Sequence, residues 1–333
     1  MPDNARWAPG EGDTALVTGA QGFIGSWLAQ RLLDAGARVV VPRRDFVPDA
    51  RFRTEGIEPR CTVVLADLQD LDSLTRILNE HDVTAVFHLA AQTIVGTANR
   101  SPLSTFEANV RGSYNLLEAC RRAAGSGTPI ERVVVASSDK AYGSHDTLPY
   151  REDFPLQPRF PYDVSKACTD LIARSYAFTF DLPVAVTRFA NIYGGGDLNW
   201  SRIVPDTCRA LVRGERPIIR SDGTPERDYL YVEDAVDAYV AVAGSVDRPE
   251  LRGRAWNAGW GEPLSVLDIV GRLTAASGRA LEPDVQGSGT PHGEIDRQFL
   301  DSTAIRAELG WEPRVALDDG LRRTFAWYER RLS

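Results

Sequence analysis

Short apolar runs alternate with longer stretches of helical periodicity through the first 190 or so residues of the chain. The stretch after Gly25, SWLAQRLLDAG, carries apolar residues at helical spacing and stops at a glycine. Strands this apolar, separated by helices, are typical of a parallel sheet that helices cover on both faces. The pattern predicts a doubly wound parallel α/β fold (Rossmann) with strands at residues 14–18, 38–41, 62–66, 85–89, 132–136 and 183–188.

The pattern becomes irregular after residue 191. A run of three glycines, Gly194 to Gly196, opens a loop, and prolines recur toward the carboxyl end. A strand followed by a helix returns at residues 228–243, and a short strand follows at 254–259. We expect residues 1–191 to form a dinucleotide-binding domain to which 228–258 returns. Residues 192–227 and 259–333 are then expected to form mainly a smaller C-terminal substrate-binding lobe.

A glycine-rich turn, TGAQGFIG, follows the first predicted strand directly. Glycines there permit a tight turn and close backbone approach, and the amino end of the next helix offers N–H groups to a pyrophosphate. The spacing G-x-x-G-x-x-G therefore predicts dinucleotide contacts from Gly19, Gly22, Phe23, Ile24 and Gly25.

Further cofactor contacts are expected where the following strands end. After the second strand, an aspartate would bind a free ribose diol and favour NAD, whereas Arg43 and Arg44 would bind a 2′-phosphate and favour NADP. We expect NAD, and the sequence leaves NADP open. An acidic residue after the third strand either meets the adenine or caps a helix, and two alanines end the fourth strand beside the nicotinamide path. The contacts expected from these segments are Arg43, Asp45, Asp67, Leu68, Ala90 and Ala91.

Polar residues gather at the end of the fifth predicted strand and on the helix that follows. Ser138 lies at the ligand edge of the sheet, and Tyr162 lies four positions before Lys166, on the same helical face. A lysine ammonium beside a phenol, with an oxidised nicotinamide nearby, lowers the pKa of the phenol. We expect Tyr162 to remove a hydroxyl proton while hydride leaves the same carbon, with Ser138 holding that oxygen, and we expect Tyr162 and Lys166 to contact the cofactor as well.

The residues after Ser138 point to a second kind of chemistry. An elimination requires an acid for the leaving oxygen and a base for the carbon proton. Asp139 can serve as the acid if burial or a neighbour raises its pKa, and Lys140 can serve as the base if its pKa is lowered. The alternative is that the two residues form a structural ion pair at the strand end.

Composition and charge narrow the classes of function. The net charge of −8 argues against nucleic-acid binding, which requires clustered Lys and Arg. The four cysteines and four histidines are scattered, which predicts reduced thiols and no metal site. The first residues lack an apolar signal segment, and no apolar run approaches membrane-spanning length. We therefore expect a cytoplasmic enzyme that contacts neither nucleic acid nor membrane.

With TGAQGFIG, SSDKAYG and YDVSK in place, the chain resembles the extended short-chain dehydrogenase/reductases that modify nucleotide sugars. Within that group it is most similar to the CDP-glucose 4,6-dehydratases, through VFHLAAQTIV, NIYGGGDLNWSRIVPD and the lysine at position 140. The resemblance implies a nucleoside diphosphate hexose as substrate. It also implies a homodimer formed by the helices around residues 106–120 and 165–180. Substrate contacts that it implies are with Asn191, Arg202, Arg227 and Arg297.

The implied reaction oxidises C4 of the hexose, removes water across C5 and C6, and returns the hydride to C6. Two alternatives remain from the sequence. A nucleotide-sugar epimerase would use Ser138, Tyr162 and Lys166 and leave Asp139 and Lys140 structural. A redox sensor without catalytic activity would bind the dinucleotide and a partner protein, although the tyrosine and lysine argue against it.

Overall fold

The computed structural model describes residues 7–289 and 295–333 and contains a central sheet of seven parallel strands. The strand order is β10-β6-β5-β4-β1-β2-β3, so the order reverses between β1 and β4. A reversal of this kind opens a crevice at the carboxyl ends of the strands. The predicted doubly wound fold is confirmed. The strands are β1 (Thr14–Thr18), β2 (Arg38–Arg43), β3 (Thr62–Leu65), β4 (Ala85–His88), β5 (Arg132–Ala136), β6 (Val184–Phe189) and β10 (Ala255–Ala258).

Helices cover both faces of this sheet because side chains along each strand alternate between two apolar cores. Val17 and Phe87 belong to the core under α1 (Phe23–Asp34), α9 (Val232–Ser245) and α11 (Thr303–Leu309). Leu16 and Val86 belong to the core under the opposite helices. These are α3 (Leu71–Glu80), α6 (Gly112–Gly125) and α7 (Pro161–Phe180).

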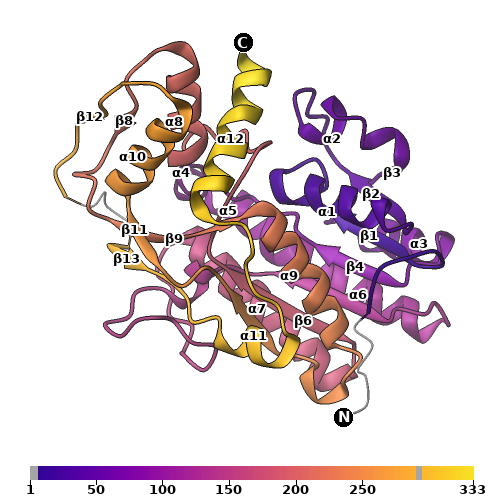
Figure 1. Cartoon of the computed structure of the whole chain (residues 1–333). Helices are drawn as coiled ribbons and strands as arrows, with labels where there is room; N and C mark the ends of the chain where they lie inside the picture. Colours follow the sequence, from indigo (N-terminus) through magenta and orange to yellow (C-terminus); the bar gives the residue numbers. More distant parts are fainter. Residues whose placement is uncertain (1–6, 290–294) are drawn as a thin grey trace.

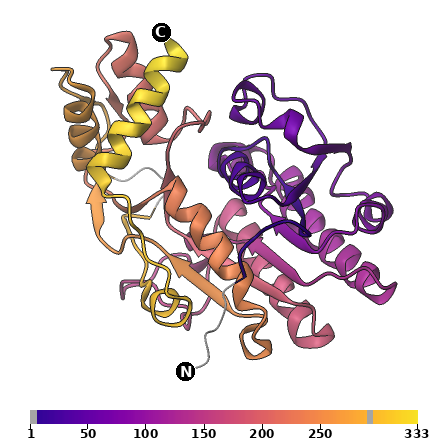
Figure 2. The same ribbon diagram turned by 45° about the vertical axis from the view of Figure 1, so that its right-hand side comes forward.

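A second, smaller lobe contains three helices packed on one another and a short mixed sheet (Figure 1). These three helices, one of which is the C-terminal helix, stay side by side when the molecule is turned (Figure 2). The helices are α8 (Ile203–Arg213), α10 (Val266–Ser277) and α12 (Leu317–Leu332). The sheet strands are β7 (Asn191–Tyr193), β9 (Glu226–Tyr231), β11 (Pro263–Ser265) and β13 (Arg297–Gln298), and β8 (Ile218–Ile219) pairs separately with β12 (Asp284–Val285).

The lobe is more regular than the sequence predicts. Proline and glycine suggest loops there, yet α10 begins with a capping box in which Ser265 and Asp268 bond each other's backbone N–H. Ile269, Val270 and Leu273 on this helix are buried against the neighbouring helices. Burial of these three apolar residues stabilises α10. The prolines before and after it make this helix hard to recognise in the sequence.

The segment 228–258 divides between the two lobes. Its strand β9 belongs to the smaller sheet, whereas α9 packs on the central sheet and β10 forms its edge. The domain limits expected from the sequence stay a proposal. The remaining short elements are α2 (Arg51–Thr54), η1 (Glu58–Arg60), α4 (Val95–Arg100), α5 (Pro102–Phe106), the π-helical turn η2 (Glu107–Arg111), η3 (Asp139–Tyr142) and η4 (Pro249–Leu251).

The loop at Gly194–Gly196 lies where the two lobes meet. A side chain at Gly195 would place its first carbon 2.4 Å from the ring of Trp327 on α12. The indole of Trp27 on α1 donates a hydrogen bond of 2.8 Å to the Gly195 carbonyl. Because indoles from both lobes press on this backbone, only glycine fits at position 195.

Within residues 7–289 and 295–333, no helix has both the length and the apolar composition needed to cross a membrane. The same residues hold no group of three or more His, Cys, Asp or Glu side chains arranged to bind a metal ion.

Candidate active site

A cleft of about 1200 Å³ runs along the carboxyl edge of the central sheet and continues under α8 and β8 of the smaller lobe. It contains nearly every residue that the sequence predicts for cofactor, substrate and chemistry. The predicted residues that line it are Gly19, Gly22, Phe23, Ile24, Gly25, Arg43, Asp45, Asp67, Leu68, Ala90, Ala91, Ser138, Asp139, Lys140, Tyr162, Lys166, Asn191, Arg202 and Arg227.

The glycine-rich turn forms one end of the cleft. A side chain at Gly25 would lie 2.2 Å from the Gly19 carbonyl oxygen, and one at Gly19 would lie 2.8 Å from the Ala90 nitrogen. The helix α1 that follows has no side-chain cap and no acidic residue in its first turn. Its amino-terminal N–H groups therefore remain available to a pyrophosphate, and these residues fit a dinucleotide.

The acidic and basic residues after β2 and β3 occupy the same end. Arg43 pairs with Glu58 at 2.7 Å, and Arg44 pairs with Asp45 at 2.6 Å. Carboxylates thus already engage both arginines, which favours a ribose diol over a 2′-phosphate. Asp67 accepts a bond from the backbone of Gln69, and the cap of α3 is Asp70 instead. Asp67 therefore does not play the helix-capping role that was its alternative.

The turn η3 carries the candidate acid. Asp139 is buried, and the Ser138 hydroxyl donates a hydrogen bond of 2.9 Å to its Oδ1. Burial raises the pKa of the Asp139 carboxyl, while Lys140, Ser138 and Arg227 act in the opposite direction. The condition that the sequence sets for an acid at this position, a raised pKa, is met.

The helix α7 carries the phenol and ammonium. Burial raises the pKa of Tyr162 to about 12, opposed most strongly by Arg202 and also by a hydrogen bond with Ser138. Burial lowers the pKa of Lys166 to about 8, and its Nζ donates a 2.6 Å hydrogen bond to the Ala136 carbonyl. The expected lowering of the Tyr162 pKa is thus absent with these protein groups alone, because burial outweighs the nearby cations.

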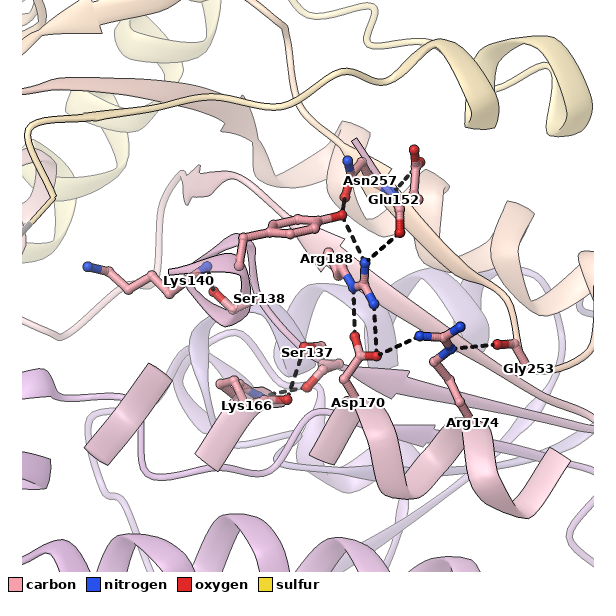
Figure 3. A network of polar contacts seen from close by, with 12 residues as sticks. Ser137, Ser138, Lys140, Glu152, Lys166, Asp170, Arg174, Arg188, Gly253 and Asn257 are labelled. Carbon is pink, nitrogen blue, oxygen red and sulfur yellow. Dashed lines mark hydrogen bonds and ion pairs between the residues drawn. The ribbon is translucent and has the colours of Figure 1, made fainter. Parts of the chain in front are cut away.

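The remaining predicted residues lie around this centre. The Lys140 side chain points away from Arg188 and the buried network behind the turn (Figure 3). Arg202 pairs with Asp197 at 3.0 Å. Burial alone would lower the Arg202 pKa, but Asp197 and Tyr162 together raise it above its usual value. Asn191 begins β7, and Arg227 lies on β9.

Arg297 is the exception among the predicted residues, because it does not line the cleft. Its side chain is 56% exposed and forms an ion pair with Glu226, and its guanidinium lies 5.1 Å from the Phe299 ring centre. The structure gives no support for the predicted contact between Arg297 and the substrate.

The cleft also contains residues that the sequence did not single out. Tyr239 on α9 is buried and contacts the ring of Phe189, with 4.8 Å between the ring centres. In the sequence it falls within an apolar helical stripe and is typical of a core residue. Arg220, directly after β8, had no signal except its charge in a loop.

Comparison with known proteins places the chain among nucleotide-sugar enzymes. Residues 15–259 match the NAD dependent epimerase/dehydratase family. A dTDP-glucose 4,6-dehydratase from Streptomyces griseus is 35% identical over 96% of this chain and 94% of its own. A UDP-glucose 4-epimerase from Mycolicibacterium smegmatis is 33% identical over 95% and 98%, respectively. A CDP-glucose 4,6-dehydratase from Salmonella typhimurium is 29% identical over 99% and 93%.

Solved structures show the same division. A UDP-glucose 4-epimerase from Thermotoga maritima has a TM-score of 0.85 and 28% identity, and covers 96% of this chain and 100% of its own. A dTDP-glucose 4,6-dehydratase from Streptomyces venezuelae, determined with NAD bound, has a TM-score of 0.82 and 30% identity, with coverage of 95% and 97%. Both reaction types therefore occur among relatives of comparable similarity.

Proposed function

Because the chain belongs to the NAD dependent epimerase/dehydratase family, the extended short-chain dehydrogenase/reductases, we propose that it is a nucleotide-sugar 4,6-dehydratase. Its substrate would be a nucleoside diphosphate hexose, with CDP-glucose as the first candidate. The family resemblance carried by NIYGGGDLNWSRIVPD and by Lys140 supports the choice of the cytosine base. The product would be the 4-keto-6-deoxy sugar.

NAD, when bound along the glycine-rich turn, would supply the acceptor for the C4 hydride and the store from which C6 receives it. Gly19, Gly22 and Gly25 would hold its pyrophosphate, and Asp45 its adenosine ribose. In the oxidation, Tyr162 takes the C4 hydroxyl proton, and Ser138 holds the same oxygen by a hydrogen bond. Lys166 would favour the phenolate by its positive charge together with that of the oxidised nicotinamide.

In the elimination, the new 4-ketone acidifies the proton on C5. Lys140 or another group acts as the base and removes that proton as the C6–oxygen bond breaks, and the Asp139 carboxyl gives its proton to the departing oxygen, which leaves as water. The same base then returns a proton to C5 when C6 receives the hydride. After the product leaves, Tyr162 gives up the C4 hydroxyl proton to solvent and Asp139 takes one from solvent.

The observation that carries this proposal is the environment of Asp139. Its carboxyl is buried in the cleft wall and accepts a hydrogen bond from Ser138, and burial raises its pKa, which favours the protonated form that a proton donor requires. An epimerase has no use for such a donor, because epimerisation requires only the transfer of hydride and of the hydroxyl proton. Asp139 therefore favours dehydration over epimerisation.

The test uses CDP-glucose deuterated at C4. A dehydratase should place the label at C6 of the product, because the abstracted hydride returns to C6 of the same molecule. Mass spectrometry of the fragmented sugar, with product NMR, locates the label. Label at C4 of an epimer would reject the dehydratase proposal and support the epimerase alternative. The same assay with UDP-, dTDP- and GDP-glucose tests the choice of base.

Dimerisation is part of the same proposal. Leu171 and Phe178, seven positions apart on α7, are 55% and 69% exposed, and Phe180, Tyr114 and Leu103 extend the apolar face over α6 and α5. The match of this face to the helices expected from the family resemblance points to a second copy of the chain as its partner.

Leu171→Asp is expected to convert a dimer of the wild type into a monomer, because a carboxylate would be buried at the centre of the apolar face. Light scattering after size exclusion measures the mass. Val285→Asp, at an exposed apolar residue on β12, serves as the matched control and should leave the mass unchanged. A monomeric wild type would contradict the proposal. The cytoplasmic location stays a prediction.

A further inference from the structure

A buried charged network lies directly behind the turn that carries Asp139 (Figure 3). Arg188 on β6 is 1% exposed and Asp170 on α7 is 0% exposed. The guanidinium donates two hydrogen bonds to the carboxylate, of 2.7 and 2.9 Å, in a bidentate pair. Its third nitrogen donates to the Tyr142 hydroxyl at 3.0 Å and to the Glu152 carbonyl at 3.2 Å.

The network continues to the edge of the sheet. The Tyr142 hydroxyl donates a 2.7 Å hydrogen bond to Asn257 on β10, whose amide donates in turn to the Tyr150 carbonyl at 2.9 Å. The backbone N–H of Asn257 also bonds the Glu152 carboxylate at 2.9 Å. Each group thus has fixed partners from separate elements, which leaves one arrangement for the whole cluster.

The network connects the two segments that carry the candidate proton-transfer groups. Tyr142 is the last residue of η3, and Asp139 is the first. Asp170 lies four positions after Lys166 and eight after Tyr162 on α7, along the same helical face. A chain of hydrogen bonds through Arg188 therefore links the end of the turn to the helix that bears the phenol.

The start of the turn is fastened to the same helix. The Lys166 Nζ donates to the Ala136 carbonyl at 2.6 Å, and the Ser137 hydroxyl donates to the Lys166 carbonyl at 3.2 Å. The segment 136–142 is thus attached to α7 at both ends. Such a double attachment fixes Asp139 and Lys140 relative to Tyr162.

We propose that Arg188, through Asp170 and Tyr142, is a positioning residue that controls how the oxidised sugar divides between loss of water and return of hydride to C4. The inference rests on the proposed dehydratase function. Oxidation requires only Tyr162, Ser138 and Lys166, whereas elimination also requires Asp139 at the C6 oxygen. Ser138 lies beside the attachment at Ser137, so a turn loosened only at its Tyr142 end would slow the second step and spare the first.

A stabilising role alone does not account for the network. A fully buried ion pair adds little stability compared with apolar side chains of the same volume, because both charges lose their hydration. A bidentate pair with two further fixed partners does give a unique geometry. The placement of this geometry beside the catalytic turn is what connects it to the reaction.

Tyr142→Phe is the main test, because it removes one hydroxyl and keeps the ring, which packs on Tyr150 with 5.1 Å between centres. The bidentate Arg188–Asp170 pair stays intact. With C4-deuterated CDP-glucose, we expect formation of labelled reduced cofactor at the wild-type rate and formation of C6-labelled product about tenfold slower. Reduced cofactor should therefore accumulate before product forms. In the Tyr142→Phe variant, the side-chain amide of Asn257 loses its bond from the Tyr142 hydroxyl. Its NMR signals should therefore shift, and its protons should exchange faster with solvent, before any cofactor is added.

Tyr176→Phe is the matched control. It removes another phenolic hydroxyl from the region, one that bonds Glu118 from α7 at 3.3 Å and has no contact with Arg188. This variant should form C6-labelled product at the wild-type rate. Arg188→Met, which leaves Asp170 only its longer ion pair with Arg174 at 3.8 Å, should slow formation of C6-labelled product further if it folds, as judged by circular dichroism.

The outcomes separate the two proposals. A wild type that does not place label at C6 overturns the dehydratase function, and the positioning role falls with it. A wild type that does so, together with a Tyr142→Phe variant whose oxidation and elimination slow equally or not at all, overturns the positioning role alone. A selective loss of elimination in Tyr142→Phe, absent from Tyr176→Phe, supports both.

Discussion

Asp139→Asn is expected to stop the reaction after the sugar has been oxidised. An amide cannot give a proton to the departing C6 oxygen, so elimination should fall by about 10²- to 10⁴-fold, the usual contribution of a positioned acid. Tyr162 and Lys166 are unchanged, so the first hydride transfer should persist. Rapid mixing with substrate should show reduced cofactor, by its near-ultraviolet absorbance, that accumulates and does not decay to product.

The control for Asp139→Asn is Asp153→Asn, which changes an exposed carboxylate paired with Arg151. It should leave the complete reaction unchanged. An Asp139→Asn variant that still forms product at a wild-type rate would favour the epimerase alternative, in which this carboxyl has no chemical role.

The stability of Asp139→Asn gives an independent check on the same group. A carboxyl whose pKa is raised on folding costs stability when it ionises. The cost is absent below the usual Asp pKa, grows as the pH rises toward the raised pKa of the folded state, and is complete above it. The amide never ionises, so the variant should unfold at the same temperature as the wild type in acid and at a higher or equal temperature at neutral pH. Loss of activity then cannot be attributed to unfolding.

Tyr162→Phe is expected to abolish the oxidation itself. Removal of the phenol leaves no group to take the C4 hydroxyl proton, so the rate of reduced-cofactor formation should fall by about 10³-fold. Affinity for NAD should change little, since the glycine-rich turn is untouched, and fluorescence titration measures it. Tyr176→Phe on the same helix should retain full oxidation. A Tyr162→Phe variant with more than a tenth of the wild-type rate would show that another group, for example Tyr239, takes the proton.

The sequence predicts the central sheet well because its signals are local. Runs such as RVVVA at residues 132–136 are buried on both faces, so their apolar character does not depend on distant residues. Tyr162 and Lys166 are also predictable, because four positions on a helix fix a shared face. The glycine-rich turn is predictable too, because its backbone segments approach one another so closely that only glycine fits there.

The sequence does not predict the contacts between the lobes, or those behind the active site, because they join residues that lie far apart in the chain. Arg188 stands in the apolar strand PVAVTR, where a charged residue is a signal, but nothing in the sequence names Asp170 or Tyr142 as its partners. For Arg297, likewise, the sequence does not show the ion pair with Glu226 that the folded chain forms, and its contact with the substrate stays a prediction. The sequence also does not show the burial that raises the pKa of Tyr162.

The glycine loop between the lobes limits how this cleft could evolve. Position 195 has no space for a side chain beside Trp327. Gly194, which lines the cleft, contributes only backbone atoms to it. New recognition groups cannot be added there without moving the C-terminal helix. We expect enzymes of this architecture to diversify their choice of substrate through other residues of the cleft, such as Ile218, whose side chain is 40% exposed.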